Sequence, residues 1–383
     1  MRHTLLSILF IFLSSHTFCQ SLSDLSFGTD STFEVVTWNI EWFPKNGSIT
    51  VDSVSKIIES LNVDLLALQE IDDSTICRQM INNLSDYELF MSNDWFGGLA
   101  YVYNSSTISI NSIYKIYDTS QFWNAFPRSP LVMDLKFMGE NIIVINNHFK
   151  CCGDGLLDSG NSSDEEARRY EASTLLKQYI DINFPTTRVI VLGDLNDILT
   201  DGSANNVFQM LLDDSTNYVF ADETIANSSS TEWSFPGWPS HIDHILITNE
   251  LFTEFSNSGS EIKVIKIDNF MAGGLASYDN NISDHRPIGL KIKVIPTNVS
   301  LVEVLNSNIN IFPNPTNGSI NIYLEETMST VKLRLTNALG QVILTKNYKS
   351  TKHINFDIDT PKGVYFLEIA TDGKVITKKI FKN

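Results

Sequence analysis

Basic residues are scarce in this 383-residue sequence, which has 27 lysines and arginines against 45 aspartates and glutamates, a net charge of 27 − 45 = −18. A protein that binds nucleic acid through a broad basic face is therefore not expected. Anionic substrates are still compatible with this charge if bound metal cations reverse the field at the site.

Cysteine is also rare, and four residues are too few for a disulfide scaffold. Cys19 lies in a leader-like segment, so Cys77, Cys151 and Cys152 belong to the mature chain. The adjacent pair could form a vicinal bridge, or one member could pair with Cys77, and an odd count leaves a free thiol unless chains cross-link. No CxxC or Cys/His spacing indicates a zinc site.

Several sequence motifs are missing as well. No GxSxG surrounds any serine and no GK[ST] loop is present, which argues against a serine hydrolase and against ATP use. With 19 glycines and 11 prolines the chain is neither collagen-like nor of low complexity, and 43% hydrophobic residues supply a core.

The first twenty residues have the features of a secretory signal. Arg2 and His3 precede an apolar run at 5–13, which is too short to span a bilayer, and small polar residues follow this run before the expected cleavage site. We expect cleavage near Cys19 or Gln20 and export, with a lipid anchor on Cys19 as the less favoured alternative. No later run is typical of a transmembrane helix.

The charge changes sign along the chain. Residues 308–383 carry ten basic and six acidic side chains, a net of +4, so residues 1–307 carry 17 − 39 = −22. Such a shift is typical of separate domains. We predict a large domain over 33–295, a linker over 296–307 and a small all-β sandwich over 308–383, where short alternating strands are separated by Gly-containing turns.

Apolar runs alternate with helical patterns in the large domain. Ser163 is the expected cap of the clearest helix, at 162–182, and a second helix is expected at 51–62. Strands are predicted at 33–40, 63–70, 99–105, 129–138, 141–149, 187–197, 241–248 and 288–295. This alternation, with several strands not separated by a helix, predicts an α/β sandwich with mixed sheets.

Polar side chains recur where these apolar strands end. The set is Asn39, Glu41, Glu70, His148, Asp194, Asn196, Asp243, Asp284 and His285. Taken singly, each is more often a solvated or capping residue. Carboxylates gathered at one sheet edge repel one another unless a divalent cation lies among them. Oxygen ligands without sulfur favour Mg²⁺ or Mn²⁺, or Ca²⁺ as a structural ion.

The HIDH segment contains two further histidines. Strand alternation places His244 on the face opposite His241 and Asp243, so we interpret His244 as structural.

Together, the segments TWNIE, LLALQE, FPRSPLV, NNHF, VLGDLND, HIDHILI and SDHRPI resemble the endonuclease/exonuclease/phosphatase family, with the deoxyribonuclease I-like fold. The resemblance covers Phe33 to Ile295 and keeps the order of the family's motifs. It implies a four-layered α/β sandwich and metal-dependent cleavage of phosphate esters.

The resemblance also implies metal contacts. Glu70 is similar to the family's principal carboxylate ligand, and Asn39 to its partner. Glu41 and Asp284 resemble additional metal-side carboxylates.

The remaining roles implied by the resemblance are catalytic. Asp194 resembles the residue that orients or deprotonates the attacking water, and Asn196 the one that holds the phosphate. Asp243 and His285 are similar to the carboxylate–imidazole pair.

Arg128 and His148 are similar to groups that stabilise the phosphate's negative charge. Some members orient this histidine with an acidic residue, for which Asn93 and Asp94 are the candidates here.

The C-terminal segment has its own resemblance. IFPNPTNGSINI, KGVYFLEI and the basic end KKIFKN are similar to a type IX secretion C-terminal sorting domain, which implies interaction with that secretion machinery and a secreted or cell-surface protein. A generic carbohydrate-binding or immunoglobulin-like module is the alternative.

The leading functional prediction is a monomeric, Mg²⁺-dependent phosphodiesterase, most plausibly a nuclease acting on extracellular DNA or RNA. The alternative with the same chemistry is a sphingomyelinase-like phospholipase or a small-molecule phosphatase, for which the aromatic segments 95–96, 122–123 and 233–238 could contact a membrane. A surface adhesin without catalysis is disfavoured by the intact acidic set. We expect the loop 150–161 to select the substrate.

Overall fold

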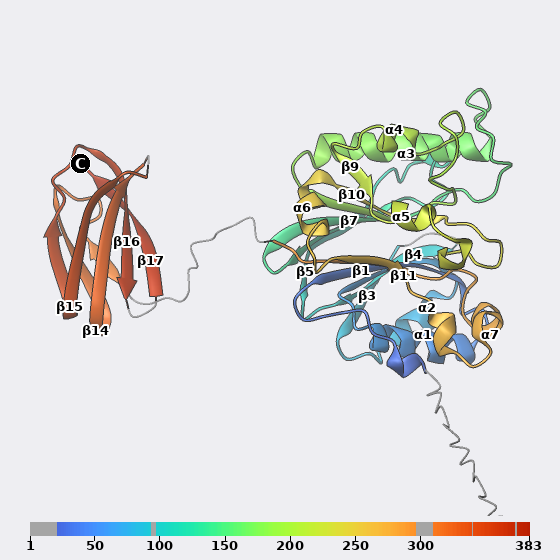
Figure 1. The fold of residues 1–383 in the computed structure, drawn as a ribbon, viewed down its shortest axis with the longest axis horizontal. Helices are drawn as coiled ribbons and strands as arrows, with labels where there is room; N and C mark the ends of the chain where they lie inside the picture. The colour runs from blue at the N-terminus through green and yellow to red at the C-terminus, as the bar shows by residue number, and fades with distance from the viewer. Residues whose placement is uncertain (1–20, 93–96, 296–308, 339, 372–373) are drawn as a thin grey trace, which may run out of the picture. The chain divides into compact units, whose positions relative to one another are not determined.

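The computed structural model describes residues 21–92, 97–295, 309–338, 340–371 and 374–383. The chain divides into two compact units, Met1–Ile295 and Pro296–Asn383 (Figure 1).

The first unit is built on two six-stranded sheets. The first sheet has the order β11-β12-β1-β2-β4-β3 and the second the order β5-β6-β7-β8-β10-β9. The strands of the first sheet are β1 (Phe33–Phe43), β2 (Leu65–Ile71), β3 (Tyr87–Met91), β4 (Gly98–Asn104), β11 (Glu261–Val264) and β12 (Ile288–Ile292). Those of the second are β5 (Ile108–Lys115), β6 (Leu131–Phe137), β7 (Glu140–His148), β8 (Arg188–Asp194), β9 (Tyr218–Phe220) and β10 (Asp243–Thr248). Both sheets are mixed, because β1–β2 and β7–β8 are parallel pairs among antiparallel ones.

Helices cover the outer faces of both sheets (Figure 1). Helices α1, α2 and α7 lie beyond the first sheet, and α3 and α4 lie beyond the second. The helices are α1 (Ser48–Leu61), α2 (Ser74–Ile81), α3 (Glu165–Asn183), α4 (Gln209–Leu212), α5 (Glu223–Ala226), α6 (Phe252–Phe255) and α7 (Gly274–Asn281). Short 3₁₀ turns lie at Leu22–Asp24, Ser120–Phe122, Ser230–Glu232, Asn249–Leu251 and Ile267–Phe270.

Three separate apolar clusters hold these layers together. Trp38 and Ile58 belong to the cluster between the first sheet and its helices, and Leu176 and Val191 to the one between the second sheet and α3. The third lies between the two sheets, where Ala67, Leu131 and Ile245 are among its buried members. Three apolar interfaces require four layers, so the predicted four-layered α/β sandwich is confirmed.

The N-cap of helix α3 lies one residue after the predicted cap. The N-cap is Asp164, whose side chain accepts a hydrogen bond from the Ala167 backbone N–H, so the prediction of Ser163 was wrong. A carboxylate at this position also interacts favourably with the positive end of the helix dipole.

The second unit is a five-stranded sheet in which all named ladders are antiparallel. Its strands are β13 (Asn310–Phe312), β14 (Ser319–Asn337), β15 (Val342–Asp357), β16 (Gly363–Thr371) and β17 (Lys374–Lys382). Alternate residues such as Ile320, Ile322, Leu333 and Leu335 are buried in one core. The predicted all-β fold of this segment is confirmed.

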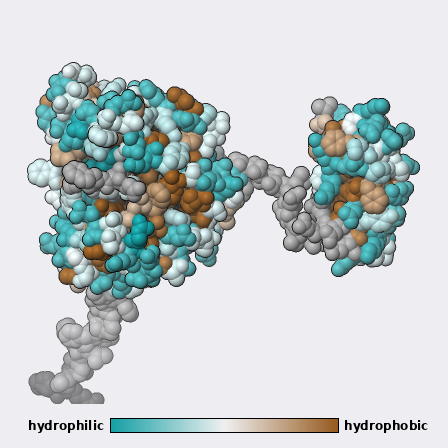
Figure 2. Space-filling model, turned by 180° about the vertical axis from the view of Figure 1, so that it is seen from behind, coloured by the Kyte–Doolittle hydropathy of each residue, from teal (hydrophilic) through white to brown (hydrophobic). Residues whose placement is uncertain are grey.

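The surface is largely hydrophilic (Figure 2). On the face shown, apolar side chains of the first unit gather in the middle, with hydrophilic regions above and below. Within the part of the chain that the structure describes, no helix has both the length and the apolar character needed to span a membrane.

Candidate active site

Three polar side chains lie side by side at one edge of the second sheet. The parallel register of β7 and β8 places His148 opposite Asp194, and the antiparallel register of β8 and β10 places Asp243 opposite Asp194. Residues opposite one another on neighbouring strands point to the same face of a sheet. The backbone register therefore gathers a histidine and two carboxylates before any side-chain contact is considered.

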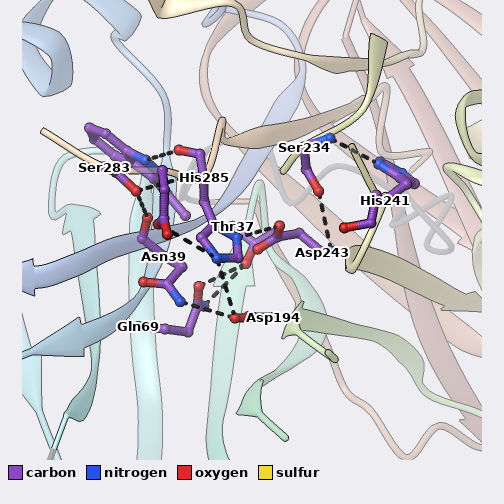
Figure 3. A network of polar contacts seen from close by, with 12 residues as sticks. Thr37, Asn39, Gln69, Asp194, Ser234, His241, Asp243, Ser283 and His285 are labelled. Carbon is purple, nitrogen blue, oxygen red and sulfur yellow. Dashed lines mark hydrogen bonds and ion pairs between the residues drawn. The ribbon is translucent and has the colours of Figure 1, made fainter. Parts of the chain in front are cut away.

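Asn39 connects this group to the first sheet. Its Nδ2 donates to Asp194 Oδ2 at 3.0 Å and to Glu70 Oε1 at 3.1 Å, and its Oδ1 accepts from the Glu41 backbone N–H at 2.9 Å (Figure 3). The amide nitrogen must face the two carboxylates, because only a donor can bind both. Asn39 thus orients Glu70 and Asp194 in this structure, and its predicted use as a metal ligand through oxygen stays a prediction.

A buried polar bridge beneath the site ties the two sheets together. Gln69 Nε2 donates to Asn146 Oδ1 at 2.8 Å, and Asn146 Nδ2 donates to the carbonyls of Leu68 and Ala100, both at 3.1 Å. All these groups are buried, so an unmatched partner would cost about 1–3 kcal/mol. Because these hydrogen bonds join β2 of the first sheet to β7 of the second, they favour the relative position of the two sheets that brings Asn39 close to Asp194.

His285 completes the cluster from the segment before β12. Its Nδ1 lies 2.8 Å from Asp243 Oδ2, its Nε2 lies 3.8 Å from Asp194 Oδ2, and the ring of Phe235 lies 4.7 Å away between centroids (Figure 3). Its backbone N–H donates to Ser283 Oγ at 2.9 Å, and the Ser283 hydroxyl donates to the Asn39 carbonyl at 2.7 Å. Ser283 therefore aligns the imidazole with β1, a role for which the sequence gave no signal beyond its place in the SDH triplet.

The electrostatics of the cluster favour a protonated His285. Burial opposes the charge, but the Asp243 and Asp194 carboxylates outweigh it and raise the pKa of the imidazole to about 10. Burial raises the pKa of the Asp194 carboxyl to about 7, with Asp243 and Glu70 adding to the shift and His285 opposing it. The cluster therefore holds more carboxylates than its one imidazolium can neutralise.

His148 has different surroundings. Its Nε2 lies 3.7 Å from Glu70 Oε1 and 3.6 Å from Asp194 Oδ2. Burial, with the nearby positive charges of Arg128 and His285, lowers the pKa of His148 well below its usual value, so the ring is neutral. Its Nδ1 has no hydrogen-bond partner among the described residues.

The candidate partners Asn93 and Asp94 lie outside the described residues. Arg128 itself approaches β4, since a Cβ at Gly97 would lie 3.2 Å from its Nη2.

Asn196 follows Asp194 in a tight turn. Its backbone adopts a left-handed conformation with φ of 55°, its N–H donates to Asp194 Oδ1 at 3.1 Å, and its Nδ2 donates to the Phe149 carbonyl at 3.3 Å. Gly193 precedes Asp194, and a Cβ there would lie 2.0 Å from the Asn147 carbonyl oxygen. The Gly-Asp-Leu-Asn sequence is thus required for β8 to approach β7 and then turn sharply.

The predicted metal-side carboxylates also converge. Glu70 has a φ of 61° and its Oε2 accepts from the Trp42 backbone N–H at 3.3 Å, while Glu41 Oε2 accepts from the Asp284 backbone N–H at 2.8 Å. Glu41 also forms an ion pair with Lys45. Burial raises the pKa of the Asp284 carboxyl to about 6, with Glu41 adding to the shift and His285 opposing it. A non-glycine residue at positive φ is strained, which is common where function depends on side-chain position.

The donor set fits a hard divalent cation. Asp243 Oδ1 and Asp284 Oδ1 are buried and accept no hydrogen bond within the described residues, although Asp284 Oδ1 lies 3.8 Å from His285 Nε2. Buried carboxylate oxygens that accept no hydrogen bond, next to further acidic groups, are costly unless a cation is bound. Carboxylate oxygens are the ligands that Mg²⁺ and Mn²⁺ prefer.

A second histidine cluster lies behind β10, and it corrects the prediction for His241. His241 Nε2 and His244 Nδ1 donate to the same oxygen of buried Asp222, at 3.0 and 2.6 Å, so His241 shares a partner with His244 rather than with Asp243. Strand alternation does not apply to His241, because β10 begins only at Asp243.

Hydrogen bonds explain this cluster without a metal. His241 Nδ1 accepts from the Ser234 N–H, and His244 Nε2 donates to the Asp197 carbonyl, so both nitrogens of His244 are donors. The ring of His244 is therefore an imidazolium paired with Asp222. Asp222 lies in a segment without a recognisable motif, so the sequence did not identify it as the partner of the two histidines.

Cys77, Cys151 and Cys152 are free in the structure. Cys77 is buried, whereas Cys151 and Cys152 are exposed with their sulfurs 2.9 Å apart, so neither of the considered bridges is present. They begin the loop between β7 and α3. This loop is attached to α3 because Arg169 Nη1 donates to the carbonyls of Lys150 and Cys152, at 2.8 and 2.7 Å.

Comparisons with known proteins give a family-model match for each of the two units. Residues 36–285 match the model of the Endonuclease/Exonuclease/phosphatase family, and residues 310–383 match that of the Secretion system C-terminal sorting domain. Among solved structures, D. rerio TDP2 complexed with a single-strand DNA product is similar, with a TM-score of 0.53 and 15% identity over 69% of this chain and 100% of that chain. A humanized D. rerio TDP2 gives a TM-score of 0.50 and 14% identity over 69% of this chain and 99% of that chain. A comparison with curated protein sequences finds no match.

Proposed function

The chain belongs to the endonuclease/exonuclease/phosphatase family, and from this membership and the site geometry we propose that it is a monomeric, Mg²⁺-dependent nuclease that cleaves extracellular nucleic acid. Family membership alone makes the protein a phosphoesterase-type hydrolase of a family that uses a divalent metal. Its C-terminal sorting domain directs it by type IX secretion to the cell surface or the extracellular space.

Glu70 and Asp284 are the residues we propose to hold the metal, with Glu41 and Asn39 supporting them. A bound Mg²⁺ would act as a Lewis acid that neutralises charge developing on the phosphate. Asn39 keeps the Glu70 carboxylate in place through its 3.1 Å hydrogen bond. Glu41 holds Asp284 through the backbone N–H of Asp284 at 2.8 Å.

Asp194 is the proposed acceptor of the proton from the attacking water. Its Oδ2 is held by Asn39 and faces the Nε2 atoms of His148 and His285 at 3.6 and 3.8 Å, so it lies at the centre of the site. A general base must be rigid and within reach of the reacting water. Asn39 supplies this rigidity from the opposite sheet.

Asp243 and His285 act as a pair. The 2.8 Å contact to Asp243 fixes the imidazole orientation and leaves Nε2 directed toward Asp194 and the reacting phosphate. His148, Arg128 and Asn196 provide donors around the same point, where negative charge develops on the phosphate oxygens.

One observation favours a nucleic acid over other phosphodiesters. Trp42 donates its backbone N–H to the Glu70 carboxylate and the residue is 42% exposed, so a solvent-accessible tryptophan is anchored through its backbone to the proposed metal ligand. Stacking of a base on an aromatic side chain is worth about 1–3 kcal/mol and does not depend on a basic surface. The acidic charge of the domain therefore does not exclude a short single-stranded substrate, and D. rerio TDP2, of the same fold, has been solved with a single-strand DNA product.

The test is hydrolysis of single-stranded and plasmid DNA by the full chain, with Mg²⁺ and with chelator. Asp194→Asn is the inactive variant, and Asp52→Asn, at an exposed position of α1, is the matched control. We expect metal-dependent cleavage that Asp194→Asn loses and Asp52→Asn keeps. Absence of cleavage in protein that still binds Mg²⁺ would contradict the nuclease proposal.

A phospholipase is the second candidate, because Trp123 is 60% and Trp238 is 79% exposed. Single exposed aromatics are common on soluble proteins, but large ones can insert into a membrane interface. Residues 95–96, also named as candidates, lie outside the described residues. Cleavage of sphingomyelin in vesicles, lost in Asp194→Asn, with no cleavage of DNA would favour this activity.

A further inference from the structure

The loop between β7 and α3 contains an acidic cluster that the catalytic site does not use. One carboxylate oxygen of each of Asp154, Asp164 and Glu166 lies within 4.8 Å of the other two. Glu166 is only 2% exposed, and its Oε2 has no hydrogen-bond partner in the described part of the chain. A buried carboxylate oxygen without a partner is costly, and the cost falls if a ligand binds there.

Each of the three carboxylates uses one oxygen to bind the backbone. Asp154 Oδ1 accepts from the Leu156 N–H at 3.1 Å, Asp164 Oδ1 from the Ala167 N–H at 2.7 Å, and Glu166 Oε1 from the Gly155 N–H at 2.7 Å. Over the described residues, the other oxygen of each carboxylate accepts no hydrogen bond. The three groups are therefore oriented by the backbone and each has an oxygen left for a ligand.

The charge of the cluster is not neutralised by the protein. Among the described residues, Arg169 is the one cation that pairs with any of the three, through Nη2 to Glu166 Oε1 at 3.1 Å. Arg169 also pairs through Nε with Asp197 at 2.8 Å, so its single charge is divided between two carboxylates. Lys150 pairs with Glu165 instead. At least two negative charges of the cluster are left for a ligand to balance.

We propose that Asp154, Asp164 and Glu166 bind Ca²⁺. Two oxygens that share a Ca²⁺ at about 2.4 Å each can be at most about 4.8 Å apart, and Mg²⁺ in addition demands a near-regular octahedron. The three carboxylate oxygens meet the Ca²⁺ condition. Ligands that are all carboxylates exclude the soft metals, and an irregular loop suits the flexible coordination of Ca²⁺.

The ion would stabilise the loop that follows His148. Gly153 has a φ of +112°, and a Cβ there would lie 2.2 Å from Glu166 Oε1, so the loop backbone packs directly on this carboxylate. The same α3 segment supplies Arg169, which holds the Lys150 and Cys152 carbonyls on one side and Asp197 on the other. A Ca²⁺ bound to Glu166 thus stabilises both loops that flank the proposed active site.

Calorimetric titration of the full chain with CaCl₂, after chelator treatment, tests this proposal. A Glu70→Gln background weakens the proposed catalytic metal site, and the loop variants made in this background then identify the Ca²⁺ that is bound at the loop. Glu166→Gln keeps the side-chain size and the acceptor for the Gly155 N–H, and Asp154→Asn changes an exposed residue while keeping an acceptor for the Leu156 N–H. Glu171→Gln, at an exposed position of α3, is the matched control.

We expect the Glu70→Gln protein to bind Ca²⁺ with a Kd of about 10⁻⁴–10⁻³ M, typical of extracellular modules. Affinity should fall at least about tenfold in Glu166→Gln and in Asp154→Asn and be unchanged in Glu171→Gln. Ca²⁺ should raise the thermal unfolding temperature only where it binds. The proposal would be overturned by no binding at millimolar Ca²⁺, by a Ca²⁺ affinity in Glu166→Gln and Asp154→Asn that equals that of the Glu70→Gln parent, or by a parent affinity for Mg²⁺ that equals its affinity for Ca²⁺.

Discussion

Replacement of Asp222 by Asn should destabilise the first unit strongly, although Asp222 touches no substrate. Its carboxylate accepts from His244 Nδ1 at 2.6 Å, from His241 Nε2 at 3.0 Å and from the Ile245 N–H at 2.8 Å, and all three side chains are buried. Removing one partner of a buried ion pair costs about 3–5 kcal/mol. We expect about 3 kcal/mol, because Asn keeps an acceptor for the Ile245 N–H and His244 can lose its proton.

The free energy of unfolding that Asp222→Asn loses should depend on pH. Burial favours the neutral form of Asp222, but the two imidazoles hold the pKa of Asp222 well below its usual range. The stability that the charged carboxylate contributes to the folded state is therefore lost as pH falls below about 4. Burial opposes charge on His244, but Asp222 raises the pKa of His244, so that contribution is complete below about pH 6.5 and is lost as pH rises through the folded value. The difference between the wild type and Asp222→Asn should therefore be largest between about pH 4 and 6.5.

Urea unfolding followed by tryptophan fluorescence measures this difference. All six tryptophans lie between residues 38 and 238, so the signal reports on the first unit alone. Asp52→Asn, at an exposed position, is the control and should change the free energy of unfolding by less than about 0.5 kcal/mol. A loss below about 1 kcal/mol, or one that is equal at pH 5.5 and pH 9, would refute the assignment of a buried imidazolium to His244.

Three further predictions concern activity. Asp243→Asn should lower kcat by about 10²–10⁴-fold at saturating Mg²⁺, because His285 loses the carboxylate that orients it, and an unchanged kcat would remove this pair from the mechanism. Chelator should abolish hydrolysis, and Glu70→Gln should raise the Mg²⁺ concentration for half-maximal rate at least about tenfold, whereas an unaltered Mg²⁺ titration would mean that Glu70 is not a ligand. Trp42→Ala should raise KM for single-stranded DNA by about 5–150-fold through lost base stacking while sparing a small phosphodiester without a base, and equal effects on both substrates would contradict the stacking role.

The main strands were predictable because their burial is a local property of the sequence. The segments 33–40, 63–70 and 141–149 are apolar runs that end in polar residues, and each forms a strand buried on both faces. Strands β3, β5, β9 and β11 were not predicted. Most residues of β3, β5 and β11 are partly or fully exposed, and β9 has only three residues, so none of the four has the continuous apolar pattern that identifies a buried strand.

The sequence by itself determined which polar groups come together. Asn39, Glu70, His148, Asp194 and Asp243 lie at the ends of apolar strands, and strands that pair in register must bring such ends to one edge. Residue type also predicts a hard divalent cation, because most of the groups that converge are oxygen donors and none is a sulfur donor.

Only the tertiary structure decided which atom faces which. Asn39 turns its nitrogen, not its oxygen, toward Glu70 and Asp194, because two carboxylates from different strands meet there. His241 precedes β10 and is bound by Asp222, so no strand periodicity could place it. Hydrogen-bond direction and ion pairing depend on groups far apart in the chain, and their geometry exists only once both sheets have packed.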